Sequence, residues 1–379
     1  MNLDPILRAE LDALEKASLR RSLRATDVMS KDMLNFAAND YLGLSHHPLL
    51  IEAARQATAQ RGAGAGASRL VTGTDSAVLA LEEHLAAWKE KEAALVFSSG
   101  YAAALGAIPA LVGRGDTVIL DKLSHASLID AARLSGATVR TFPHNNTARL
   151  ETLLAKISSG KTRTLIVTES IFSMDGDAAP LRELVELKER FGAWLLVDEA
   201  HATGLYGATG AGLLAEAGLS ARVEIVMGTL SKALGSVGGY IAGSRALIDW
   251  LVNRARSFIY STALPPGVIA ASRAAVDLAR GPEGVALRDR LRKNIGHFQA
   301  GLPPGWKNKA LSASAIQPLI RGEASAALQL AATLRKSGFL IPAIRYPTVP
   351  RHAARLRVTL SAAHATTDID ALNQALAIN

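Results

Sequence analysis

The stretch "EIVMGTLSKALGSVGGYIAG" (residues 224–243) holds two short apolar runs separated by a glycine-rich segment with one lysine, Lys232. The runs 224–227 and 239–243 are typical of β-strands. A lysine among small residues at the end of a strand is an unusual choice for a surface. Most lysines are nevertheless solvated surface groups. The role of Lys232 therefore depends on what the rest of the chain places beside it.

Apolar runs of the same kind recur along the chain, at residues 93–97, 117–120, 164–168 and 193–198. Helical patterns separate them, and this alternation predicts an α/β fold with a mostly parallel sheet covered on both faces. A second set of helices and strands, including residues 355–360, follows and indicates a smaller C-terminal domain. We predict three parts: an N-terminal helical segment (1–35), a large domain (36–265) and a small C-terminal domain (266–379).

The composition narrows the class of protein. The chain has 379 residues, of which 49% are hydrophobic and 20% are charged, as in soluble globular proteins. It has no cysteine, which excludes disulfides, thiolate metal sites and a cysteine nucleophile, and we predict no metal site. The N-terminus lacks the apolar core of a signal peptide, and residues 102–113 are too short to span a membrane. We therefore expect a cytoplasmic protein.

The formal net charge is +8, but the basic residues form no long run. A solvated surface is the simplest explanation, and a small anionic substrate is the alternative. We predict neither a nucleic-acid nor a membrane partner.

Polar residues at the ends of the predicted strands are the candidates for a functional site. In open parallel sheets, ligands bind beyond the carboxyl ends of the strands. The candidates there are Ser98, Ser99 and Gly100 after the first run, Ser173 after 164–168, Asp198 and His201 after 193–198, and Thr229 and Lys232 after 224–227.

This set matches the needs of pyridoxal 5′-phosphate (PLP). The cofactor aldehyde needs a lysine, its pyridine nitrogen a carboxylate, and its phosphate a helix start with hydroxyl donors. Each residue alone has a simpler reading: Asp198 could cap a helix, and His125 could be an ordinary half-buried histidine. The order of Asp198, His201 and Lys232 along successive strands favours the functional interpretation.

The chain resembles the α-oxoamine synthases, PLP-dependent enzymes with the aspartate-aminotransferase fold. The stretches that carry this resemblance are "NDYLGLSHHP", "GASRLVTGT", "LSHASLIDAARLSG", "ESIFSMDGDAAPL", "VDEAHATGLYG", "GTLSKALGSVGGY" and "IYSTALPP". It implies PLP-dependent transferase fold type I, with a mostly parallel seven-stranded sheet in the large domain and a smaller α+β domain.

The resemblance also implies roles at the cofactor. Lys232 would bind PLP covalently and act as base, Asp198 would pair with the ring nitrogen, and His201 would bond the ring hydroxyl. His125 would stack on the ring and contact the substrate. The implied cofactor contacts are Gly100, Tyr101, His125, Ser173, Asp198, His201, Thr229 and Lys232, with Ser261 and Thr262 reaching the phosphate of the neighbouring subunit in a homodimer with shared sites.

On the substrate side, Asn39 and Arg357 would face the carboxylate of the amino acid. Arg21 and Thr348 would contact the acyl substrate, and Arg20 could replace Arg21 in that role.

Stretches such as "AIRYPTVP" and "ARLRVTLSAAH" are most similar to family members of biotin biosynthesis. Those enzymes condense L-alanine with a pimeloyl thioester, on coenzyme A or acyl carrier protein, with loss of CO₂. A sister enzyme that joins glycine to acetyl-CoA is the main alternative. An aminotransferase and a non-catalytic domain of a DNA-binding regulator are less favoured, since neither explains the whole set of motifs.

Overall fold

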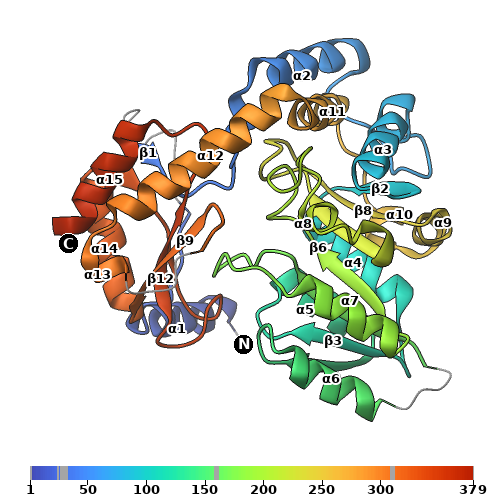
Figure 1. Ribbon diagram of the computed structural model, residues 1–379, viewed down its shortest axis with the longest axis horizontal. Helices are drawn as coiled ribbons and strands as arrows, with labels where there is room; N and C mark the ends of the chain where they lie inside the picture. The colour runs from blue at the N-terminus through green and yellow to red at the C-terminus, as the bar shows by residue number, and fades with distance from the viewer. Residues whose placement is uncertain (1, 24, 26–32, 158–161, 308–311, 379) are drawn as a thin grey trace. The chain divides into compact units, whose positions relative to one another are not determined.

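The computed structural model describes residues 2–23, 25, 33–157, 162–307 and 312–378 (Figure 1). The chain divides into two compact units. The larger unit comprises Asn39–Ser173 and Asp177–Arg290, and the smaller unit comprises Met1–Ala38, Met174–Gly176 and Leu291–Asn379. The two units group residues that pack together, and they combine separate stretches of the chain. The three domain ranges given above therefore stay a prediction.

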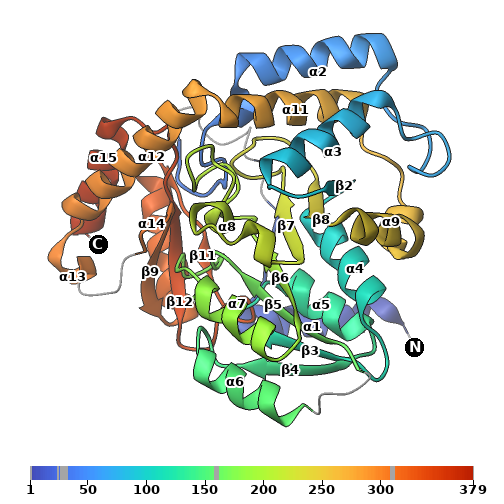
Figure 2. The same ribbon diagram turned by 45° about the vertical axis from the view of Figure 1, so that its right-hand side comes forward.

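A seven-stranded sheet forms the centre of the larger unit, in the order β2-β8-β7-β6-β5-β3-β4 (Figure 2). Strand β8 is antiparallel to both of its neighbours, and the other adjacent pairs are parallel. The strands are β2 (Ala93–Phe97), β3 (Thr117–Asp121), β4 (Thr138–Phe142), β5 (Thr164–Glu169), β6 (Trp194–Asp198), β7 (Ile225–Thr229) and β8 (Gly239–Gly243). The predicted fold, with a mostly parallel seven-stranded sheet, is confirmed.

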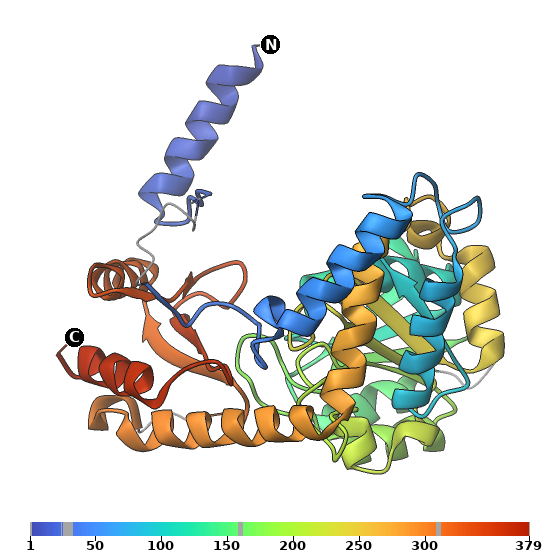
Figure 3. The same cartoon turned by 90° about the horizontal axis from the view of Figure 1, so that it is seen from above.

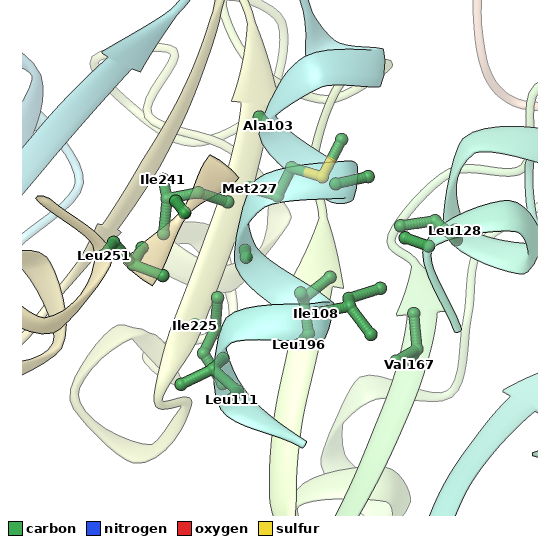
Figure 4. Close-up of a cluster of buried hydrophobic side chains, with 14 of the residues drawn as sticks. Ala103, Ile108, Leu111, Leu128, Val167, Leu196, Ile225, Met227, Ile241 and Leu251 are labelled. Atoms are coloured by element: carbon green, nitrogen blue, oxygen red, sulfur yellow. The ribbon is translucent and has the colours of Figure 1, made fainter. Parts of the chain in front are cut away.

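The inner strands are mostly apolar and buried because helices cover both faces of the sheet. Strand β4 differs: it lies at the sheet edge, only Phe142 is buried in it, and its mixed sequence "TVRTF" gave no strand signal. On one face, buried side chains of the strands pack against α4, α5, α9 and α10 (Figure 4). This core fixes the strand ends, and therefore the residues that follow them.

Several helices of the larger unit begin at a residue whose side chain accepts a hydrogen bond from the first turn. The Asp75 carboxylate accepts hydrogen bonds from the first turn of α3, as expected for an N-cap. The helices are α2 (Pro48–Arg61), α3 (Ser76–Trp88), α4 (Gly100–Leu111), α5 (Ala126–Leu134), α6 (Thr147–Lys156), α7 (Leu181–Arg190), α8 (Leu213–Glu216), α9 (Arg245–Arg254), α10 (Arg256–Ile259) and α11 (Pro266–Arg280). The long α12 (Pro282–Gly301) crosses from this unit into the smaller one.

The smaller unit is α+β, with an antiparallel sheet in the order β11-β12-β9. A short parallel pair joins β1 to β10. Its elements are α1 (Leu3–Lys16), β1 (Leu34–Asn35), α13 (Pro304–Lys307), β9 (Ile316–Gly322), α14 (Ala324–Lys336), β10 (Phe339–Leu340), β11 (Ala343–Ile344), β12 (Ala354–Thr359) and α15 (Thr366–Ile378).

Helix α1 matches the helical spacing expected near the N-terminus, and Figure 3 shows its full length. None of its side chains is buried within this chain. Among the described residues, no helix is both long and apolar enough to cross a membrane.

Candidate active site

Lys232 and His201 meet just beyond the carboxyl ends of β7 and β6. Lys232 lies in the turn after β7, and its Nζ is 2.8 Å from His201 Nε2. The other ring nitrogen, His201 Nδ1, is 2.6 Å from the hydroxyl of Tyr41, a buried side chain. Tyr41 in turn donates to Asn39 Oδ1 at 3.1 Å. A continuous polar chain therefore runs from Asn39 to the lysine amine.

Asp198 is the last residue of β6 and is buried. Its Oδ1 accepts a hydrogen bond of 2.8 Å from the backbone N–H of Ala200. Burial raises the pKa of the Asp198 carboxyl, and the charge of Lys232 opposes that rise. A cation near this carboxylate would favour its ionised form, which suits a partner for a protonated ring nitrogen.

His125 caps the N-terminus of α5, and burial lowers the pKa of its imidazole. Its backbone N–H donates to Glu169 Oε1 at 2.6 Å. Glu169 Oε2 accepts from the backbone N–H of Ser173 at 3.2 Å. One buried carboxylate at the end of β5 therefore links His125 to Ser173. Burial and the neighbouring Asp198 carboxylate raise the pKa of Glu169 to about 8.

The first turn of α4 provides donors for an anion. Ser99 caps this helix by accepting from the N–H of Ala102 at 3.0 Å, so the earlier N–H groups of Gly100 and Tyr101 start the helix without intrahelical acceptors. A methyl group added at Gly100 would lie 3.7 Å from Cβ of Thr229, so the end of β7 faces this turn. Backbone donors, a hydroxyl and the helix dipole together suit a phosphate.

Ser261 and Thr262 lie elsewhere in the larger unit. They line a cavity of about 370 Å³ together with Ser98, Phe97 and other residues. Thr262 also forms an isolated β-bridge with Ser68. Their predicted contact with the phosphate of a second subunit involves a chain that this structure does not contain, and it stays a prediction.

Residues predicted to contact the acyl substrate meet within the smaller unit. Arg21 donates to the Thr348 hydroxyl at 3.1 Å. Arg20 instead forms an ion pair with Glu15, with 3.7 Å between Arg20 Nε and Glu15 Oε2. Arg20, Arg21, Arg345 and Thr348 line a cavity of about 500 Å³. Burial, and then the charge of Arg21, lowers the pKa of Arg345. This concentration of guanidinium groups suits an anion.

Arg357 lies on β12 of the smaller unit and is buried. It donates to the hydroxyl of Thr359 at 3.1 Å. Asn39, the other residue predicted to face the substrate carboxylate, belongs to the larger unit.

Comparison with known proteins identifies the family to which this geometry belongs. The family model of aminotransferases of class I and II matches residues 31–376. The chain belongs to the class I and II aminotransferase family. Among its relatives in this family is the 8-amino-7-oxononanoate synthase of Geobacter metallireducens, 49% identical over 368 residues, which covers 95% of this chain and 94% of the relative. The enzyme of the same name from Methylobacterium radiotolerans is 48% identical and covers 99% of this chain and 98% of the relative.

Solved structures of related enzymes have the same fold. A serine palmitoyltransferase from S. paucimobilis, with a bound PLP–myriocin aldimine, has a TM-score of 0.93 at 28% identity and covers 100% of this chain and 98% of the other. An 8-amino-7-oxononanoate synthase from Francisella tularensis has a TM-score of 0.77 at 27% identity, covering 92% and 98%. The resemblance to α-oxoamine synthases and to fold type I is therefore confirmed.

The residues present fit the cofactor of this family. The larger unit brings together a lysine amine, a buried carboxylate, an imidazole and a helix start facing a hydroxyl, at Lys232, Asp198, His201, Gly100 and Thr229. These groups match the aldehyde, ring nitrogen, ring hydroxyl and phosphate of PLP.

Two residues of this site were not predicted. Glu169 ends a buried strand in the same way as Asp198, and the two are register partners in adjacent parallel strands, so the rule that found Asp198 could have found Glu169. Tyr41 lies 160 positions from His201, and nothing in the motif "NDYLGL" indicates that pairing.

Proposed function

We propose that this protein is a PLP-dependent C-acyltransferase that joins L-alanine to a pimeloyl thioester. The products are 8-amino-7-oxononanoate, CO₂ and the free carrier, in biotin biosynthesis. The observation that carries the proposal is the 46–49% identity, over nearly the whole chain, to several 8-amino-7-oxononanoate synthases. The residues at the strand ends support the same chemistry.

When bound, PLP supplies a carbonyl for attachment to an amine and a protonated ring that withdraws electrons from the substrate Cα. Lys232 is the amine that holds the cofactor. With alanine bound, Lys232 Nζ would be the base that accepts the Cα proton. His201, 2.8 Å from that nitrogen, orients the lysine, and Tyr41 fixes the imidazole from its other side.

Asp198 would hold a proton on the ring nitrogen of the cofactor. In a buried site a carboxylate and a pyridinium stabilise each other's charged forms. His125 would pack against the bound cofactor and exclude water from it. Gly100, Tyr101 and Thr229 would hold the phosphate by backbone and hydroxyl donors.

Both substrates carry a carboxylate group, and arginines are suited to bind carboxylates. Arg357 holds the alanine carboxylate, because a planar guanidinium binds a carboxylate through two hydrogen bonds. The resemblance assigns Asn39 to the same carboxylate. Arg21 and Thr348 contact the acyl substrate, which ends in a second carboxylate. Their hydrogen bond within a cavity lined by several arginines supports Arg21 rather than Arg20 in this role.

The active unit is a homodimer in which Ser261 and Thr262 complete the phosphate site of the partner. The enzyme acts on small molecules in the cytoplasm. The resemblance to family members supports both the homodimer and the cytoplasmic location.

The purified enzyme with PLP, offered different substrate pairs, tests this function. Alanine, glycine and serine are each combined with pimeloyl, acetyl, succinyl and palmitoyl thioesters, and the product mass is measured. We expect alanine with a pimeloyl thioester to react fastest. If glycine with acetyl-CoA reacts faster, the activity is that of a sister enzyme.

A further inference from the structure

Glu169 is a buried carboxylate whose two oxygens accept bonds from different segments of the chain. Oε1 accepts the backbone N–H of His125 at 2.6 Å, and Oε2 accepts the backbone N–H of Ser173 at 3.2 Å. Glu169 itself ends β5, in register with Asp198 at the end of β6. The side chain therefore joins two loops to the central sheet at the level of Asp198.

The two loops joined in this way both carry residues of the proposed cofactor site. His125 begins α5 after β3, and Ser173 lies in the loop that follows β5. Hydrogen bonds from backbone N–H groups constrain the main chain at these points, and so fix where each side chain starts. An uncompensated carboxylate in this position would be costly, because it is only 2% exposed and lies beside Asp198.

We propose that Glu169 is a positioning residue, which sets the ring-covering side chain of His125 and the hydroxyl of Ser173 for the cofactor through their backbone N–H groups. The inference rests on the proposed PLP-dependent function. Glu169 touches neither substrate nor cofactor in this assignment. Its removal acts on the cofactor only through the two loops.

Two substitutions separate this role from simple support of the fold. Glu169→Gln keeps the shape and one acceptor oxygen, but turns an NH₂ group toward one of the two N–H donors. Glu169→Ala removes both acceptors. A hydrogen bond between uncharged groups contributes roughly two- to tenfold to an equilibrium constant. We therefore expect PLP affinity to fall roughly two- to tenfold in Glu169→Gln and further in Glu169→Ala.

The measurements are the dissociation constant of PLP, by fluorescence titration of apoenzyme, and the visible circular dichroism of the bound cofactor. Glu224→Gln is the matched control. Glu224 also accepts a backbone N–H, that of Leu195 at 3.0 Å, but it precedes β7 at the opposite end of the sheet. Thermal melting of the apoenzymes shows which variants are folded.

The proposal requires that folded Glu169→Gln binds PLP more weakly and with altered dichroism, while Glu224→Gln binds like wild type. Wild-type affinity and dichroism in both Glu169 variants would overturn it. If Glu169→Ala does not fold, Glu169→Gln decides alone. Failure of the wild-type protein to bind PLP would instead refute the proposed function.

Discussion

His144 is held between two carboxylates in the larger unit. Its Nδ1 is 3.0 Å from Asp121 Oδ1, and its Nε2 is 2.7 Å from Asp177 Oδ2. Although burial alone would lower the pKa of His144, the two hydrogen-bonded carboxylates raise it to about 10. The imidazolium ties the end of β3 to Asp177, in the loop that also carries Ser173.

We expect this cluster to stabilise the protein in a pH-dependent way. The pKa of His144 is higher in the folded state than its ordinary value of 6.5, so its contribution is complete below about pH 6.5 and is lost as pH rises toward about 10. The contribution of His144 is the difference in the free energy of unfolding between wild type and His144→Gln, measured by urea unfolding from pH 6 to pH 10.5. The stability difference should shrink with rising pH. A difference that stays constant or grows would show that His144 does not carry this charge.

Two arginines are assigned to different substrates, and kinetics can separate them. Removing a guanidinium that binds a buried carboxylate costs roughly 3–5 kcal/mol. Arg357→Ala should therefore raise the KM for alanine far more than that for the pimeloyl thioester, and Arg21→Ala should do the reverse. Arg20→Ala should raise the KM for the thioester less than Arg21→Ala does, because Arg20 Nε lies 3.7 Å from Glu15 Oε2. If both Arg21 and Arg357 variants weaken the same substrate, one of the two assignments is wrong.

At the scale of elements, the apolar strands and the cap of α3 could be predicted because each has a local signal. The apolar run 239–243 predicted strand β8 with its first and last residues, and Asp75 indicated the start of α3. Strand β4 could not be predicted, because an edge strand with exposed side chains needs no apolar pattern.

The cap of α3 can be tested by itself. Asp75 Oδ1 accepts hydrogen bonds from the N–H groups of Ala77 and Val78, and Asp75 Oδ2 is 2.9 Å from Nη1 of Arg61. Asp75→Ala should reduce the free energy of unfolding by about 1 kcal/mol, measured in urea. Asp75→Asn keeps the cap and loses only a half-exposed ion pair, so it should cost less. Equal losses in the two variants would assign the effect to the ion pair.

At the scale of the whole molecule, the family and its cofactor could be predicted because long motifs identify them. The contacts between the candidate residues were harder to foresee. Tyr41 and His201 are brought together only by folding, and the pairing of Arg21 with Thr348 spans 327 positions. The predicted contact of Ser261 and Thr262 with a second subunit cannot be examined in the packing of one chain.

Shared sites in a homodimer predict complementation between two inactive variants. Lys232→Ala removes the covalent anchor, and a Ser261→Ala/Thr262→Ala chain removes the hydroxyls given to the partner. In a mixed dimer one site would hold both defects and the other neither, so mixing should restore part of the activity. Differently tagged chains would show that hybrids form. Hybrids as inactive as both parents would contradict the shared site.

The central claim is that Lys232 binds the cofactor, and trapping that bond tests it most directly. The PLP-loaded enzyme is treated with borohydride, digested, and its peptides are analysed by mass spectrometry, with Lys232→Ala as control. We expect the reduced cofactor on the peptide that contains Lys232, and no such adduct in the variant. An adduct on another lysine of the wild-type protein, or none despite bound PLP, would contradict the account.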